Sequence, residues 1–166
     1  MTITSKTKYA EFQPVEKYLE ESAVADLKKA AEREYTNMYD LTFGQFLRVS
    51  DGYFSDVLGD MSEPTVLQIY WIKRFEDFQK EFGDAIKGTQ VQPTKEQAEA
   101  MEGLPKQTFT ESMITFARSY FGLHSFSEAE NLTIGELIIA RRDAYISAIY
   151  ERRLQAIQLK NIRTKK

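Results

Sequence analysis

His124 is the one histidine of the chain and the first residue to weigh for catalysis. It stands in the segment Gly122–Phe126, with Glu128 and Glu130 shortly after it. One imidazole and two carboxylates could serve as general acid and base, or as a weak metal site. A general base also needs an orienting partner and a substrate pocket, and the sequence indicates neither. We therefore interpret His124 as a loop or helix-capping residue and keep a hydrolase acting through it as an alternative.

The rest of the composition removes most other chemistry. The 166 residues include no Cys, which excludes disulfides, thiolate zinc sites, iron–sulfur clusters and cysteine nucleophiles. The 8 Gly form no cluster, so the sequence contains neither a dinucleotide-binding motif nor a P-loop motif. We expect a protein that is not an enzyme, with no catalytic, cofactor-binding or metal-binding residues and no small-molecule substrate.

Aromatic residues are the most abundant positive signal. The chain has 11 Phe, 9 Tyr and 1 Trp. Phe and Trp at helical spacing are core residues, whereas Tyr suits an interface where one end of the ring is apolar and the other is wet. Tyr53, Tyr145 and Tyr150 lie close to two similar segments of the chain, and we predict that they bind a protein partner.

The charge of the chain is unevenly distributed. The formal net charge is −3, yet residues 141–166 carry eight Lys and Arg against Asp143 and Glu151, a local charge of +6. The remainder therefore carries −9. The basic side chains expected to contact a partner are Arg152, Arg153, Lys160, Arg163, Lys165 and Lys166. An amphipathic basic helix of this kind can bind nucleic acid or an acidic protein, and it can also be a solvated terminal helix.

The hydrophobic spacing is helical throughout. From Thr65, apolar residues recur every three or four positions through Phe82. Further helices are expected over Val15–Glu34, Phe43–Leu58, Lys95–Met101 and Phe109–Phe121, and from Ile134 past Leu159. No stretch alternates as a strand. The sequence predicts an all-α fold, a compact helical bundle of about five to six helices.

Five helix starts share one capping pattern. A Thr is followed three residues later by Gln or Glu at Thr42, Thr65, Thr94, Thr108 and Thr133. In such a capping box the Thr hydroxyl accepts from the third backbone N–H, and the Gln or Glu side chain accepts from the N–H of the Thr. The pattern places the helix boundaries and carries no catalytic meaning.

The expected domain organisation is simple. Residues 1–13 are polar and predict a flexible N-terminal arm, residues 14–160 a single helical domain, and residues 161–166 a basic C-terminal tail. The first ten residues lack the apolar run of a signal peptide, and no apolar stretch could span a bilayer. We expect no membrane partner and a cytoplasmic location.

Two of the helix starts suggest an internal duplication. Residues 41–47 read LTFGQFL and residues 132–138 read LTIGELI, at an offset of 91. A later Asp-x-Tyr-x-Ser element, at Asp51 and Asp143, pairs at 92. A Gly in a first helical turn lowers helix propensity, so a repeated one suggests that another backbone approaches closely. The alternatives are a true duplication, which places the two helices about a local two-fold axis, and convergent helix starts.

These helix starts resemble those of small morphogenesis proteins of tailed bacteriophages, among them tail-assembly chaperones and helical virion connectors. The resemblance covers residues 41–55 and 132–147. It implies a protein that oligomerises or binds other virion components, located in the host cytoplasm or the virion. We thus expect a non-enzymatic helical assembly or structural protein acting through protein–protein contacts. The alternative is a small nucleic-acid-associated regulatory protein that uses its basic C-terminal helix.

Overall fold

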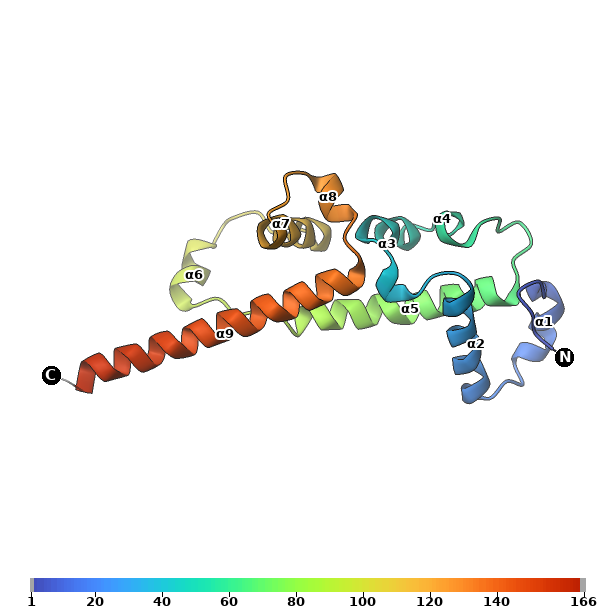
Figure 1. Cartoon of the computed structure of the whole chain (residues 1–166), viewed down its shortest axis with the longest axis horizontal. Helices are drawn as coiled ribbons and strands as arrows, with labels where there is room; N and C mark the ends of the chain where they lie inside the picture. The colour runs from blue at the N-terminus through green and yellow to red at the C-terminus, as the bar shows by residue number, and fades with distance from the viewer. Residues whose placement is uncertain (1, 165–166) are drawn as a thin grey trace. The chain divides into compact units, whose positions relative to one another are not determined.

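The computed structural model describes residues 2–164, and within that range the protein is all-α (Figure 1). This part of the chain forms nine α-helices and one 3-10 helix, without a β-strand, so the fold class is confirmed and the helices outnumber the five to six expected. The helices are α1 (Tyr9–Glu16), α2 (Glu21–Glu34), η1 (Met38–Asp40), α3 (Phe43–Ser50), α4 (Ser55–Leu58), α5 (Val66–Lys87), α6 (Lys95–Ala100), α7 (Phe109–Phe121), α8 (Phe126–Glu130) and α9 (Ile134–Thr164).

The chain divides into two units, where the sequence led us to expect one helical domain over residues 14–160. Unit 1 consists of Met1–Gly83 and Glu130–Gly135, and unit 2 of Asp84–Ala129 and Glu136–Lys166. Unit 1 contains ten Lys and Arg against sixteen Asp and Glu, whereas unit 2 contains twelve against nine. The formal charges are therefore −6 and +3, so unit 1 is acidic and unit 2 is basic.

The core of unit 1 is an aromatic cluster along α5. Trp71, Phe75 and Phe78 are buried on one face of this helix, as the spacing predicts. Phe46 of α3 packs against this face, with its ring centroid 5.4 Å from that of Phe75 and 6.3 Å from that of Phe78. Aromatic contacts at these distances add to the stabilisation from burial.

The predicted arm over residues 1–13 is structured in its second half. The Tyr9 N–H donates to the Pro64 carbonyl, the Val66 N–H donates to the Thr7 carbonyl, and α1 begins at Tyr9. Phe12 is 2% exposed. The polar composition concealed this because one apolar ring and two backbone hydrogen bonds suffice to hold the segment. At the other end, α9 continues to Thr164, through most of the predicted tail.

Two predicted helices are interrupted. The expected helix over Val15–Glu34 is broken between α1 and α2, and Pro14 lies inside α1 rather than at a helix start. The expected helix over Phe43–Leu58 is broken between α3 and α4 by Gly52, whose φ is +96°. Residues with a side chain rarely adopt this backbone conformation, so the glycine at position 52 allows α3 to end here.

Four of the predicted capping boxes, at Thr42, Thr65, Thr94 and Thr108, are confirmed. Thr42, Thr94 and Thr108 each accept from the third backbone N–H of their helix, and each receives the reciprocal contact. Thr65 does the same with Gln68 at the start of α5. At the far end of α7, Gly122 adopts the left-handed conformation expected of a helix stop.

The two similar helix starts lie against one another within unit 1. The Phe43 N–H donates to the Leu132 carbonyl at 2.8 Å, and the Ile134 N–H donates to the Leu41 carbonyl at 2.8 Å. The two donors, Phe43 and Ile134, are 91 residues apart, and so are the two acceptors, Leu41 and Leu132. Residues 41–43 and 132–134 are therefore related by a local two-fold axis, as a duplication predicts.

The repeated glycines occupy equivalent sites around this axis. A Cβ atom on Gly44 would lie 3.4 Å from the backbone oxygen of Glu130, and one on Gly135 would lie 3.2 Å from that of Tyr39. Tyr39 and Glu130 are themselves 91 residues apart. The close backbone approach expected from the repeated Gly is present in both copies.

The equivalence does not extend to the Asp-x-Tyr-x-Ser elements. Asp51 follows the last residue of α3, and Tyr53 is in the break before α4. Asp143 and Tyr145, by contrast, lie inside α9. Ala144 stands where the first copy has Gly52, so the second helix continues where the first one stops.

Unit 2 has three open hollows at its surface. Hollows of about 680, 1010 and 510 Å³ all have Met101 in their lining. The 680 and 1010 Å³ hollows adjoin α6, whose six residues are all exposed, and the 680 and 510 Å³ hollows reach α9. Buried side chains in this unit gather on α7, at Met113, Ile114 and Ala117.

Candidate interaction surface

One face of α9 carries a row of exposed apolar side chains, which we call the α9 stripe. Its members are between 41% and 70% exposed: Ile139, Ile146, Tyr150, Leu154 and Ile157. Because successive residues of an α-helix are rotated by about 100°, these five fall within a sector of about 80°. Several adjoining apolar side chains in solvent mark an interaction site more often than scattered single ones do.

The stripe lies opposite the face of α9 that packs inside unit 2. Leu137 is fully buried, and Ala144 and Ala148 are half-buried on that packed face. α9 is thus apolar on two sides, of which only one is covered. An ordinary surface helix has one apolar stripe and an opposite polar face.

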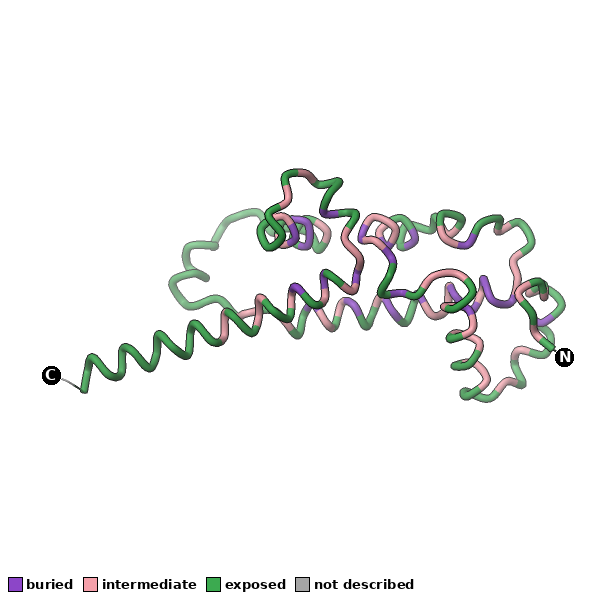
Figure 2. Tube along the Cα trace, in the orientation of Figure 1, coloured by how far each residue is buried: buried purple, intermediate pink, exposed green. Residues whose placement is uncertain are grey.

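The end of α9 buries none of its described residues. Every residue from Tyr150 to Thr164 is exposed (Figure 2). A helix of about 12–15 residues is only marginally stable in water without tertiary contacts. The last four turns of α9 therefore stand to gain most from a binding partner.

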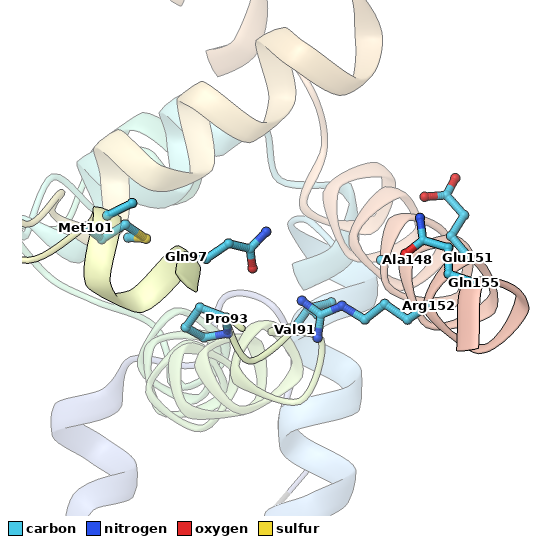
Figure 3. A pocket seen from close by; sticks show the side chains of 9 residues that line it. Val91, Pro93, Gln97, Met101, Ala148, Glu151, Arg152 and Gln155 are labelled. Carbon is cyan, nitrogen blue, oxygen red and sulfur yellow. The ribbon is translucent and has the colours of Figure 1, made fainter. Parts of the chain in front are cut away.

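The predicted basic residues lie along this exposed part of α9. Arg153, Lys160 and Arg163 are exposed, while the Arg152 Nη1 donates to the Gln92 carbonyl at 2.8 Å. Figure 3 shows Arg152 extending from α9 toward the loop that carries Val91 and Pro93, at the edge of the 680 Å³ hollow. Lys165 and Lys166 lie outside the described residues.

The three predicted tyrosines do not form one surface. Tyr150 lies in the α9 stripe. Tyr145 is half-buried on the packed side of α9, where it lines the 510 Å³ hollow with Phe116 and Arg141. Tyr53 belongs to unit 1, where the Arg48 guanidinium lies 4.8 Å from its ring centroid.

Arg141 supports the packed side of α9. Its guanidinium lies 4.8 Å from the Phe116 ring centroid, and its Nε is buried without a hydrogen-bond partner. Burial lowers the pKa of this guanidinium below its ordinary value. Part of its polar surface is thus withdrawn from water beside the 510 Å³ hollow.

The sequence-based site missed the centre of the stripe. Ile139, Ile146 and Ile157 were not predicted to bind a partner, nor was Asp143, whose carboxylate accepts from the Tyr120 hydroxyl. A signal for the three isoleucines exists in the sequence, because with Tyr150 they are spaced by seven, four and seven residues. That spacing indicates a helix face.

His124 has the capping environment expected of it. Its backbone N–H donates to the Glu128 carboxylate at 2.8 Å, and the Glu128 N–H donates to the Ser125 hydroxyl at 3.2 Å. These contacts tie down the start of α8. Within residues 2–164, no group of three or more His, Asp or Glu side chains is placed to hold a metal ion.

A second polar cluster lies between α1 and α5 in unit 1. The Glu16 carboxylate accepts from the hydroxyls of Tyr9 and Tyr70 and from the Lys73 ammonium. Burial opposes the charge of Glu16, but these three donors outweigh it and hold the pKa below its ordinary value. The hydrogen bond to Glu16 raises the pKa of Tyr9 to about 12. A phenol of raised pKa gives up its proton poorly near neutrality, which argues against acid–base catalysis by this cluster. Its hydrogen bonds instead fasten α1 to α5.

Comparisons with protein families, curated proteins and solved structures find no match for this chain. None of the helices in the described part of the chain is both long and apolar enough to cross a membrane.

Proposed function

We propose that this chain is a non-enzymatic helical assembly protein that binds other protein subunits through α9. The observation that carries the proposal is the α9 stripe, a second apolar face on a helix that already buries its first. Transferring apolar side chains from water into a protein contact contributes about 25 cal/mol per Å² of apolar surface buried. Five such side chains in one row provide a sizeable driving force for association.

The unpacked end of α9 supports the same role. Leu154 and Ile157 of the stripe lie within the last four turns and are 41% and 57% exposed. A partner that packs there would both bury these side chains and stabilise the helix. Such a contact suits a protein that connects subunits.

The composition of the stripe favours protein over nucleic acid. Its centre is formed by isoleucines, whereas the bases Arg153 and Lys160 lie along one flank. Nucleic-acid binding relies mainly on Lys and Arg contacts to phosphate. Arg152, which the sequence assigned to a partner, already donates to the Gln92 carbonyl. The nucleic-acid-associated regulator is thus the second candidate, favoured by the basic end of the chain alone.

The resemblance of the two helix starts to phage morphogenesis proteins agrees with a contact-based role. In this proposal the chain acts during virion assembly, by joining helical subunits or by shielding a subunit before it is incorporated. The basic flank of α9 would then lie against acidic protein surface.

Photo-crosslinking tests the proposal. A photoreactive residue at Tyr150 is exposed to a lysate of the source organism and to duplex DNA of about 30 base pairs, and Gln158 serves as an exposed control position off the stripe. We expect protein adducts from position 150 that disappear in Ile146→Glu, with few from position 158. Adducts to DNA alone, or equal yields from both positions, would overturn the proposal.

A further inference from the structure

We infer that the partner of the α9 stripe is a second copy of this chain, with the two α9 helices packed antiparallel about a two-fold axis level with Ala148. This inference rests on the proposed function, because it names the subunit that the stripe binds. It follows from the order of side chains along the stripe and from their charges.

Four of the five stripe residues, together with Asp143 and Arg153 at the edges of the stripe, have the spacing of a coiled-coil seam. Positions 139, 143, 146, 150, 153 and 157 alternate in steps of four and three residues, the a and d pattern of a heptad. The steps read four, three, four, three, four from either end. A seam with such palindromic spacing fits its own reverse, which is the requirement for two identical helices to pack antiparallel.

The chemistry of the seam is self-complementary in the same register. Each layer of the seam pairs one residue with a residue of the second copy, and the numbers of the two add up to 296. Ile146 faces Tyr150 of the second copy, and Ile139 faces Ile157 of the second copy. Asp143 faces Arg153 of the second copy, so the acid in the seam meets a base. These six layers cover residues 139–157, or about 27 Å of helix.

Charge distinguishes the antiparallel pair from the parallel one. In a parallel pair, Asp143 would face Asp143 and Arg153 would face Arg153, so both polar layers would repel. The Asp143 carboxylate already accepts from the Tyr120 hydroxyl, which holds it at the surface, and a carboxylate has room for further donors. Arg153 is exposed and can supply them.

The residues beside the seam leave room for close approach. Ser147 and Ile149 would each lie near their own counterpart at the axis, and Arg142 would lie near Ala156 of the second copy. Opposed small and apolar side chains avoid further like-charge contacts. Arg152 points away from this face toward Gln92, so its charge is held apart from the pair.

Single cysteines test this arrangement directly, because the chain has no Cys of its own. The full-length variants Ile139→Cys and Ile157→Cys are oxidised separately and as an equal mixture, and dimers are measured on non-reducing gels. Both positions are exposed, and circular dichroism checks that each variant is folded. We expect disulfide-linked dimers in the mixture at about tenfold the yield of either variant alone.

A charge exchange provides the second readout. Asp143→Arg and Arg153→Asp should each weaken self-association about tenfold in sedimentation equilibrium, and the double variant should restore it. Dimers of Ile139→Cys alone would show a parallel pair and overturn the inference. A chain that remains monomeric while Tyr150 crosslinks another protein would also overturn it and leave the proposed function standing. A chain that neither self-associates nor forms protein adducts from position 150 would contradict the proposed function itself.

Discussion

At the scale of single residues, two glycines set how closely the repeated helix starts approach each other. Gly135 is the tighter site, because the atom facing its missing Cβ is the Tyr39 carbonyl oxygen at 3.2 Å. A backbone oxygen cannot move aside as the far end of a flexible side chain can. The identity of this residue is therefore a packing requirement of the local two-fold contact.

The glycine contact predicts opposite effects at two helical positions. Gly135→Ala should lower the free energy of unfolding by about 1–2 kcal/mol, because the steric cost exceeds the gain in helix propensity. Gly83→Ala in α5, where nothing lies within 4 Å of the added Cβ, should raise it by about 0.5–1 kcal/mol. Urea denaturation measures both. Equal shifts for the two variants would contradict the close contact.

Glu16 links the stability of unit 1 to pH. Since its folded-state pKa is below the ordinary value of 4.5, the ionised carboxylate stabilises the folded state above that pH. The contribution is lost as the pH falls through the folded-state pKa. For Tyr9 the sign is reversed, and its stabilisation is lost only as the pH rises through about 12.

A charge-neutral variant isolates the Glu16 contribution. Glu16→Gln should lower the free energy of unfolding by about 1–2 kcal/mol at pH 7, since it weakens hydrogen bonds to a charged acceptor. The difference from the unmodified protein should shrink at pH 3, where the native carboxylate is itself becoming protonated. Denaturation curves at both pH values measure this. A difference that grows toward pH 3 would contradict the assigned role.

At the scale of elements, capping patterns and hydrophobic periodicity predicted where helices begin. They did not predict how the helices pack. Thr42, Thr65, Thr94 and Thr108 mark their helix starts because a cap is a local interaction between residues three apart. The break at Gly52 and the docking of Phe12 were missed because each depends on a particular backbone conformation or a distant partner. For the same reason the period of α9 predicted a helix and did not indicate which of its faces is covered.

The end of α9 should contribute little to the stability of the isolated chain. Residues 151–164 bury no side chain, so a chain ending at Gln155 retains the Arg152 contact to Gln92 and loses only exposed turns. We expect its free energy of unfolding to stay within about 0.5 kcal/mol of the full chain. Because the truncated chain lacks Ile157, it should nevertheless bind its partner more weakly. Thermal unfolding followed by circular dichroism measures the first quantity, and a large drop in stability would show that the end of α9 packs within the chain.

At the scale of the whole molecule, the net charge of −3 is the sum of two units of opposite sign. The sequence showed the basic C-terminal region, but the unit boundaries fall inside α5, at the end of α8 and at the start of α9, where no linker composition marks them. The candidate surface could be predicted as the basic end of the chain. Its apolar centre could not be predicted, because exposure depends on which face of α9 the rest of unit 2 covers.

The mass of the full chain in solution, measured as a function of concentration, tests self-association through the α9 stripe most directly. Sedimentation equilibrium should show a monomer–dimer equilibrium that Ile146→Glu weakens at least about tenfold, because it places a charge in the central apolar layer. The exposed off-stripe variant Gln158→Glu should leave the equilibrium unchanged. A chain that is monomeric at all concentrations, or a dimer that is equally insensitive to both substitutions, would contradict self-association through the α9 stripe.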